Sequence, residues 1–262
     1  MPFTSTPALR AEILRACRVL TYFRIVEGFG HVSARVAGSD LMVITPRIAL
    51  GKVTEDLLVE QDMDGKQVAG GGHPPLEAAM HIAVYKRRAD ILAIARGHPR
   101  NVAAYASAAE PLRIGHGIGA NLGHIVPVFE KPVLAADPQL GMGVADALGD
   151  HVGVILQSNG MLAGGMSVAH ACVNAIFMEE TAEAQLKAEA AGFKPKYYTP
   201  EGAARRHGDD REHEPIRAWD YYVAMAEGRM AWLRQATRAE GLSQTQTTAP
   251  PRREGSAPRE DT

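Results

Sequence analysis

The stretch from residue 73 to 105 holds several side chains that could carry out acid–base or metal chemistry. Glu77 and His81 lie four residues apart, so on a helix they share one face. His98 follows an apolar run and precedes Pro99, which places it at a turn between a strand and a helix, where functional side chains are readily presented. A carboxylate and an imidazole in one site can move protons or bind a divalent cation. A single histidine at such a turn can equally cap a helix or pack.

Several well-known site motifs are absent from the 262 residues. There is no H-E-x-x-H pair, no G-x-x-x-x-G-K-[ST] loop and no G-x-S-x-G turn, which argues against a helical zinc site of that type, a P-loop nucleotide site and a serine hydrolase. The net charge of −2 gives no reason to expect binding to nucleic acid or to a membrane. The two cysteines cannot form a disulfide framework. With charged residues near the start of the chain and no apolar run long enough for a membrane span, we expect a cytoplasmic protein.

Hydrophobic periodicity and turn residues predict the elements that must position these side chains. The first expected helix begins at Thr6-Pro7 and runs to near Gly28. Further helices are expected over 76–88, 101–108, 140–150 and 167–191. The expected strands cover 41–45, 91–95 and 124–129, with hairpins at Asp64-Gly65 and around Ser158-Asn159-Gly160. This order predicts an α/β fold with three layers, α/β/α, built on a central, mostly antiparallel sheet.

The C-terminal part of the chain changes in composition. The mixed charge run at 205–215 is predicted to be a solvated loop. Residues 241–262 are polar and rich in proline, so they cannot bury enough apolar area to offset their ordering entropy. We therefore expect a single domain over residues 1–240 and a disordered tail over 241–262.

The order and spacing of these segments resemble the class II aldolase/adducin family. The resemblance spans roughly residues 9–190 and rests on the stretch 73–105, on GFGHVSAR at 28–35, on ITPRIALG at 44–51 and on the long helix after 167. It implies a class II aldolase-like fold, an enzyme acting on a small molecule, and a homotetramer with sites between subunits. In that family a Glu and three His surround a divalent cation, usually zinc, which polarises a carbonyl or carboxylate and holds an enolate as it forms.

The family's metal-ligand positions are only partly kept in this chain. Glu77 and His98 match the Glu and the second His, but Arg96 stands at the first His position and Asn159 at the third. A guanidinium cannot lose its proton to bind a metal, and an amide oxygen suits magnesium, calcium or manganese better than zinc. Two interpretations remain open. In one, Glu77, His98 and Asn159 hold a weaker divalent-metal site (zinc, manganese, magnesium or iron). In the other, the metal is absent and Arg96 supplies fixed positive charge.

The turns that bind phosphate in the family's sugar-phosphate aldolases also differ. His31 and Arg47 stand among residues where small neutral donors are expected, and the serines before the family's Glu are lost. Such a pocket favours a planar carboxylated or phenolic substrate, similar to family members that decarboxylate aromatic acids. His31 and Arg47 can alternatively cap or form surface salt bridges. His116 and His124 flank a glycine-rich loop that borders the site in the family, and either of them, or His31, can complete a weaker metal site.

We therefore predict a carbon–carbon lyase that acts on a small carboxylated, aromatic compound, with decarboxylation favoured over aldol cleavage. The catalytic residues are predicted to be Glu77, His98, Arg96 and His31. The substrate-binding residues are predicted to be Arg47, Thr45, Asn159, His116 and His124, and the possible metal ligands Glu77, His98 and Asn159. Two alternatives remain: a non-haem iron oxygenase acting on an aromatic substrate, and a non-catalytic, adducin-like binding module.

Overall fold

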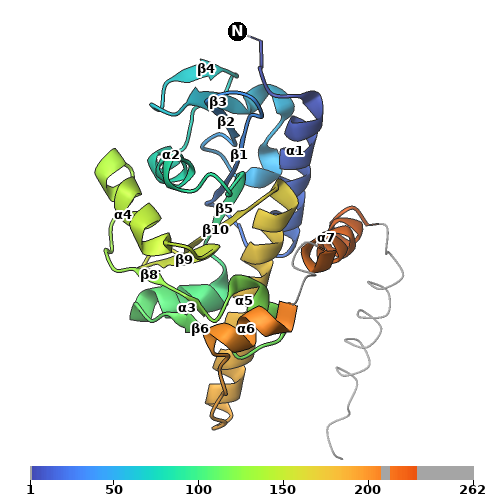
Figure 1. The fold of residues 1–262 in the computed structure, drawn as a ribbon. Coiled ribbons are helices and arrows are strands. Elements are labelled where there is room, and N and C mark those ends of the chain that lie inside the picture. The colour runs from blue at the N-terminus through green and yellow to red at the C-terminus, as the bar shows by residue number, and fades with distance from the viewer. Residues whose placement is uncertain (1, 208–212, 229–262) are drawn as a thin grey trace, which may run out of the picture. The chain divides into compact units, whose positions relative to one another are not determined.

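The computed structural model describes residues 2–207 and 213–228. Within them, eight strands form a central sheet in the order β4-β3-β2-β1-β5-β10-β9-β8 (Figure 1). Neighbouring strands of this sheet are antiparallel, except that β8 and β9 run parallel. The described residues up to Glu227 belong to one compact unit. The predicted boundary at residue 240 and the predicted tail lie outside the described residues.

The bounds of the helices and strands are as follows. The helices are α1 (Pro7–Tyr22), α2 (Ala78–Arg87), α3 (Arg100–Ala108), α4 (Pro138–Leu148), α5 (Val168–Ala190), α6 (Pro200–His207) and α7 (His213–Ala226), with short 3-10 helices at Leu50–Lys52, Glu55–Leu57 and Ile118–Leu122. The strands are β1 (His31–Arg35), β2 (Leu41–Ile44), β3 (Val59–Asp62), β4 (Gln67–Ala69), β5 (Ala93–Gly97), β6 (Leu112–Arg113), β7 (Ile125–Val126), β8 (Val128–Phe129), β9 (Gly153–Leu156) and β10 (Met161–Gly165).

Helices cover both faces of the central sheet. Figure 1 shows α2 and α4 on one side of the strands and α1 and α5 on the other. Val32 and Ala34 of β1 belong to the hydrophobic core on the α1 and α5 side. Because successive side chains of a strand point to opposite faces, His31, Ser33 and Arg35 face α2. The predicted three-layer α/β fold is thus confirmed, and it includes a row of polar side chains between β1 and α2.

Capping residues explain where the helices begin and end. The Oγ1 of Thr6 accepts a hydrogen bond from the Leu9 amide at 3.2 Å, and Pro7 is the first helical residue, as the sequence predicts. Ser167 caps α5 in the same way. The first helix ends at Tyr22, short of the predicted Gly28, because Arg24 takes a φ of 58°, which a right-handed helix cannot accommodate.

Two predicted elements differ from the structure. The strand expected over 124–129 is split into β7, which pairs with β6, and β8, which joins the central sheet. Pro127 lies between them and has no amide hydrogen to donate to a ladder. The loop expected over 205–215 is partly helical, because α6 extends to His207 and α7 begins at His213.

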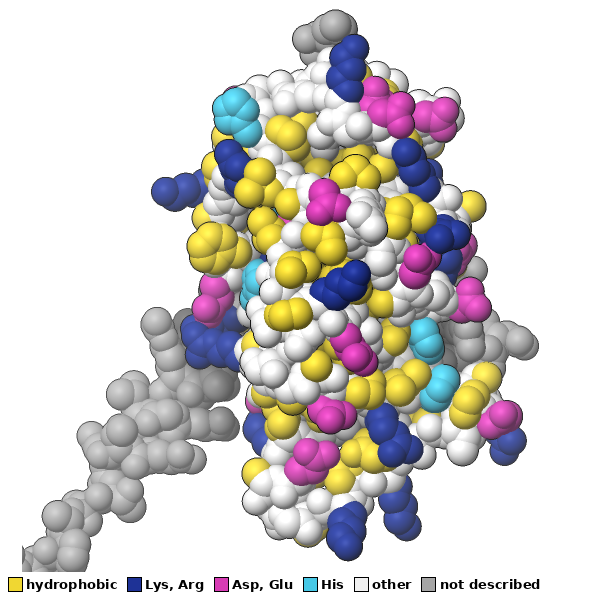
Figure 2. Space-filling model, turned by 90° about the vertical axis from the view of Figure 1, so that its left-hand side faces the viewer, with side chains coloured by type: hydrophobic (Ala, Val, Ile, Leu, Met, Phe, Trp, Pro, Cys, Tyr) yellow, Lys and Arg dark blue, Asp and Glu magenta, His cyan; other side chains and the backbone are white. Residues whose placement is uncertain are grey.

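The surface over α2 and α4 carries mixed charge. Figure 2 shows acidic and basic side chains interspersed with exposed hydrophobic ones on this face. None of the helices in the described ranges is both long and apolar enough to span a membrane.

Candidate active site

Arg96 lies at the centre of a buried cluster of polar side chains. Its Nη2 is 3.0 Å from Glu77 Oε2 and donates a hydrogen bond to Asn159 Oδ1 at 2.8 Å. Its Nη1 contacts the Nε2 of His98. The Nδ2 of Asn159 donates to Glu77 Oε1 at 2.8 Å, which closes the cluster. The structure therefore brings together four of the residues predicted to form the site, with Arg96 between the other three.

The central sheet and its turns position this cluster. Arg96 is the fourth residue of β5 and pairs with His31 across from β1 and with Leu162 across from β10. The Asn159 side chain comes from the turn between β9 and β10, in which Gly160 takes a φ of 75°. A Cβ at Gly160 would lie 2.3 Å from the Gly97 carbonyl oxygen and 2.9 Å from His98 Nδ1. The turn therefore packs directly against the end of β5, and glycine is required there.

Glu77 is ionised in this environment. Burial raises the pKa of Glu77, but the hydrogen bond with His31 and the charge of Arg96 outweigh burial and lower it to about 2. Burial lowers the pKa of His98 to about 4, and the positive charge of Arg96 acts in the same direction. Burial also lowers the pKa of His31. At neutral pH the site thus consists of a carboxylate–guanidinium ion pair beside neutral imidazoles.

A second row of polar side chains continues from Glu77 into the protein. His31 Nε2 is 3.5 Å from Glu77 Oε2, and His31 Nδ1 lies 2.7 Å from His81 Nε2. The Oγ of Ser33 lies 2.7 Å from both His81 Nδ1 and Tyr85 Oη. Sequence reasoning placed His81 on the helix face of Glu77 but assigned no role to Ser33 or Tyr85. The sequence does contain a pattern that indicates this row. Alternate residues of β1 are polar, and so is every fourth residue from Glu77 along α2.

A cavity of about 630 Å³ opens onto the ion pair. It is lined by Gly28, Phe29, Gly30, His31, Pro46, Arg47, Ile48, Ala49, Pro75, Leu76, Glu77, Arg96, His98, Leu134 and Asn159. The large apolar side chains among these are exposed, with Phe29 at 79% and Leu76 at 55%. The cavity thus has a charged floor and an apolar rim, which suits a flat anionic molecule.

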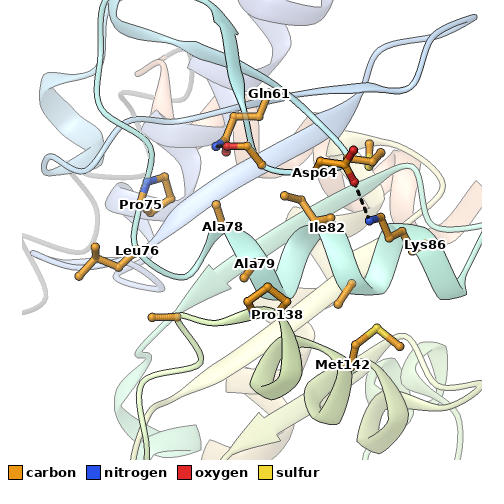
Figure 3. A pocket seen from close by; sticks show the side chains of 14 residues that line it. Gln61, Asp64, Pro75, Leu76, Ala78, Ala79, Ile82, Lys86, Pro138 and Met142 are labelled. Atoms are coloured by element: carbon orange, nitrogen blue, oxygen red, sulfur yellow. Dashed lines mark hydrogen bonds and ion pairs between the residues drawn. The ribbon is translucent and has the colours of Figure 1, made fainter.

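A neighbouring cavity of about 470 Å³ shares Pro75 and Leu76 with the first. Figure 3 shows that it lies between α2 and α4 and is lined mostly by apolar side chains, with the ion pair of Lys86 and Asp64 (3.3 Å) at one end. Neither Glu77 nor Arg96 reaches it. The chemistry therefore belongs to the first cavity.

The structure separates three predicted substrate-binding residues from the cavity. Thr45 is fully buried, and its Oγ1 accepts a hydrogen bond from the Val32 amide at 3.0 Å, so it holds β2 against β1. His116 and His124 flank the 3-10 helix at Ile118–Leu122, and His124 stacks near His151 with ring centroids 6.0 Å apart. None of the three lines the cavity. Arg47 does line it and is exposed.

The profile of the Class II Aldolase and Adducin N-terminal domain matches residues 11–186. The chain belongs to this family. Among solved structures, an L-fuculose 1-phosphate aldolase superposes with a TM-score of 0.73 at 26% identity, covering 77% of this chain and 95% of the aldolase. The chain is therefore an enzyme of the class II aldolase superfamily and has its mostly antiparallel fold, as the sequence predicts.

Characterised relatives with similar sequences include decarboxylases and aldolases. A 3,4-dihydroxyphthalate decarboxylase of Arthrobacter keyseri is 31% identical over 207 residues, which cover 73% of this chain and 82% of the relative. A decarboxylase of the same name from Rhodococcus jostii is 30% identical, covering 72% and 84%. A 5-methylthioribulose-1-phosphate/5-deoxyribulose-1-phosphate aldolase of Escherichia coli O45:K1 is 33% identical over a shorter stretch, 59% of this chain and 72% of the relative.

Class II aldolases typically bind a divalent metal, and the donor set of this member does not fit one. Atoms of Glu77, Asn159 and His98 that would face a cation all contact the guanidinium of Arg96. This guanidinium stays protonated and repels a cation. Among the described residues, no group of three or more His, Cys, Asp or Glu is arranged to hold a metal ion.

Proposed function

We propose that this class II aldolase homologue is a metal-independent decarboxylase of a small aromatic acid that carries carboxylates and a phenolic hydroxyl. The observation that carries the proposal is the buried guanidinium of Arg96, which provides fixed positive charge at the floor of a cavity with an apolar rim. Support also comes from the similarity to the dihydroxyphthalate decarboxylases. Of the two alternative functions, the oxygenase needs an iron site, and Arg96 takes up the donors that would form it.

Arg96 and Arg47 bind the anionic oxygens of the substrate. Arg96 lines the cavity, so its guanidinium is placed to pair with a substrate oxygen. The exposed guanidinium of Arg47 lies at the same cavity and can pair with a second carboxylate. Phe29 and Leu76 pack against the ring. Two arginines and an apolar rim distinguish a planar diacid from a sugar phosphate.

Decarboxylation replaces carbon dioxide with a proton at a ring carbon. In a 3,4-dihydroxyphthalate, one carboxylate is adjacent to a phenolic hydroxyl, which donates electron density into the ring. A proton adds to the ring carbon that bears this carboxylate, and the resulting positive charge is shared with the phenolic oxygen. The bond to the carboxylate carbon then breaks, its electron pair restores the aromatic ring, and carbon dioxide leaves. The reaction consumes one proton and needs no oxidant.

Glu77 delivers this proton to the ring carbon. In the free enzyme it is ionised, but a substrate carboxylate bound beside it raises its affinity for a proton, because two neighbouring carboxylates repel each other. His31, whose Nε2 lies 3.5 Å from Glu77 Oε2, is positioned to supply the proton. Arg96 binds the substrate oxygens by charge-assisted hydrogen bonds and orients the ring carbon toward Glu77.

The proposal is tested with purified protein that has been dialysed against EDTA. We expect carbon dioxide release from 3,4-dihydroxyphthalate, undiminished by the chelator, and no cleavage of L-fuculose 1-phosphate. Glu77→Gln is expected to lower kcat by at least about 100-fold, since it removes the acid. Turnover of the sugar phosphate alone, or loss of activity in EDTA that added metal restores, contradicts the proposal. Oxygen consumption would favour the oxygenase, and ligand binding without turnover would favour the binding module.

A further inference from the structure

We propose that the buried row Glu77, His31, His81, Ser33 and Tyr85 is a proton relay between the catalytic cavity and a second pocket on the surface, whose lining carries both carboxylates and basic side chains. This inference rests on the proposed function, because decarboxylation consumes one proton in each turnover. The relay supplies that proton from the side of the protein that the substrate does not occupy.

Three of the four links in the row are hydrogen bonds, and the fourth, between Glu77 and His31, is a longer contact in which His31 Nε2 has no hydrogen-bond partner among the described residues. From Glu77 Oε2 it is 3.5 Å to His31 Nε2, and from His31 Nδ1 it is 2.7 Å to His81 Nε2. Two further contacts of 2.7 Å link His81 Nδ1 to Ser33 Oγ and Ser33 Oγ to Tyr85 Oη. All five side chains are buried, and His81 and Ser33 have no exposed surface. Water therefore cannot reach the row between its two ends.

Each link of the row contains one donor and one acceptor when both histidines are neutral. Tyr85 donates to Ser33, Ser33 to His81 Nδ1, and His81 Nε2–H to His31 Nδ1. The remaining hydrogen, on His31 Nε2, lies on the side of Glu77, with 3.5 Å between Nε2 and Oε2. Burial lowers the pKa values of His31 and His81, which favours these neutral forms. The direction of every hydrogen bond is then the same, and it points toward the catalytic carboxylate.

Proton transfer shifts each hydrogen by one link. The four N–H or O–H bonds break as four new ones form, so Glu77 gains a proton and Tyr85 becomes a phenolate. The guanidinium of Arg35 lies 4.8 Å from the centre of the Tyr85 ring, where it stabilises the phenolate. Burial raises the pKa of Tyr85, which favours its return to the neutral phenol. Both imidazoles then carry their hydrogen on the other nitrogen, and rotation of the imidazoles and of the two hydroxyl groups restores the starting direction of the row.

Tyr85 connects the row to a separate pocket of about 540 Å³. This pocket is lined by Arg35, Asp40, Asp62, Met63, Asp64, Tyr85, Lys86 and Ala89, and it shares no lining residue with the catalytic cavity. Carboxylates at a surface exchange protons with water and raise the local concentration of cations. The pocket is thus suited to return a proton to Tyr85.

Packing alone does not account for these residue types. On the opposite face of β1, Val32 and Ala34 are buried against an apolar core. Placing two imidazoles and two hydroxyls in the buried layer costs desolvation free energy, which apolar residues at the same positions would avoid. A proton path uses these residue types in this order.

The test compares Ser33→Ala, Tyr85→Phe and the double variant with the wild type. Each change removes only a hydroxyl. We expect kcat for decarboxylation to fall by at least about 10-fold with KM unchanged, and the solvent deuterium isotope effect on kcat to increase, because proton delivery becomes rate-limiting. The double variant is expected to match the slower single variant, since both changes interrupt the same path. Tyr222→Phe, which removes a phenol that donates to Glu180 at 3.0 Å, is the control and is expected to behave as the wild type.

The outcomes separate this proposal from the proposed function. Wild-type kcat in both single variants, or effects that multiply in the double variant, overturns the relay. If the wild type releases no carbon dioxide, the proposed function is wrong, and hydrogen exchange then decides about the relay. In protein labelled with 15N-histidine, Tyr85→Phe is expected to slow deuterium exchange at His81 Nε2. Unchanged or faster exchange overturns the relay, because loosened packing accelerates exchange and a closed proton path slows it.

Discussion

Arg96 and Glu77 form a buried ion pair whose charges determine the protonation of their neighbours. The Glu77 carboxylate has a pKa of about 2, against an ordinary value of 4.5, and the His98 imidazole a pKa of about 4, against 6.5. Both shifts make the native state bind fewer protons than the unfolded chain in acid. Burial is the largest cause of the His98 shift, and the hydrogen bond with His31 lowers the pKa of Glu77 against burial; Arg96, the departure from the family's ligand set, contributes to both shifts.

The stability of the native state depends on pH through Glu77. The pKa of this group is lower in the folded state than in the unfolded one, so its ionised form stabilises the protein above pH 4.5, and the contribution is lost as pH falls from 4.5 to about 2. The shift corresponds to about 3 kcal/mol. We expect the free energy of unfolding of the wild type to exceed that of Glu77→Gln by an amount that is constant near neutrality and shrinks over this range. Urea titrations of both proteins at several pH values measure it, and a difference that grows as pH falls would be the opposite result.

The ligand positions that Arg96 and Asn159 occupy can be converted to histidine. The double variant Arg96→His/Asn159→His provides three imidazoles beside Glu77, which is the donor set that the family uses. We expect it to bind zinc in a one-to-one ratio by elemental analysis. The single variant Asn159→His keeps the guanidinium and is the matched control, expected to bind none. Stoichiometric zinc in the control, or in the wild type, would show that Arg96 does not displace the metal.

Among the structural elements, the turn between β9 and β10 holds Asn159 against the end of β5. Gly160 has a φ of 75° and no room for a Cβ, whereas Gly38 has a φ of 72° and open space around it. We expect Gly38→Ala to cost about 1 kcal/mol of stability, from backbone strain alone, without changing activity. Gly160→Ala is expected to cost more and to lower kcat, since the new Cβ meets His98 and the Gly97 carbonyl. Thermal unfolding and turnover assays on both variants compare the two effects, and equal losses would contradict this account.

The positions of the elements in the chain follow from local signals, and the sequence therefore predicts most of them. Thr6 and Ser167 cap their helices as expected, and β5 lies within two residues of the predicted strand. The contact between β1 and α2 was not predicted, because it depends on how two distant segments are aligned. Two residues of a strand rise about 6.6 Å and four residues of a helix about 6 Å, so His31 and Ser33 match His81 and Tyr85 in spacing. For the same reason the sequence could not show that Thr45 and His116 lie away from the lining of the cavity.

For the whole molecule, the exposed apolar rim of the cavity is a candidate contact surface for an assembly. Phe29, Leu76 and Leu134 are large, apolar and about half or more exposed around its opening. We propose that they contact a neighbouring subunit in the homotetramer that the family resemblance implies. Sedimentation should then give four times the chain mass of 28.1 kDa, and Phe29→Asp should reduce that mass and weaken substrate binding. A monomeric wild type with full activity would refute the assembly.

The guanidinium of Arg96 also has a consequence for how the enzyme matures after its synthesis. If the enzyme works without a metal, as proposed, the cation that it needs is part of the polypeptide and is complete when translation ends. Maturation would then involve no step that loads an ion, and scarcity of zinc or iron would leave the activity unaffected. In the proposed mechanism, the guanidinium of Arg96, which the gene encodes, takes the place of a bound metal ion as the positive charge of the site.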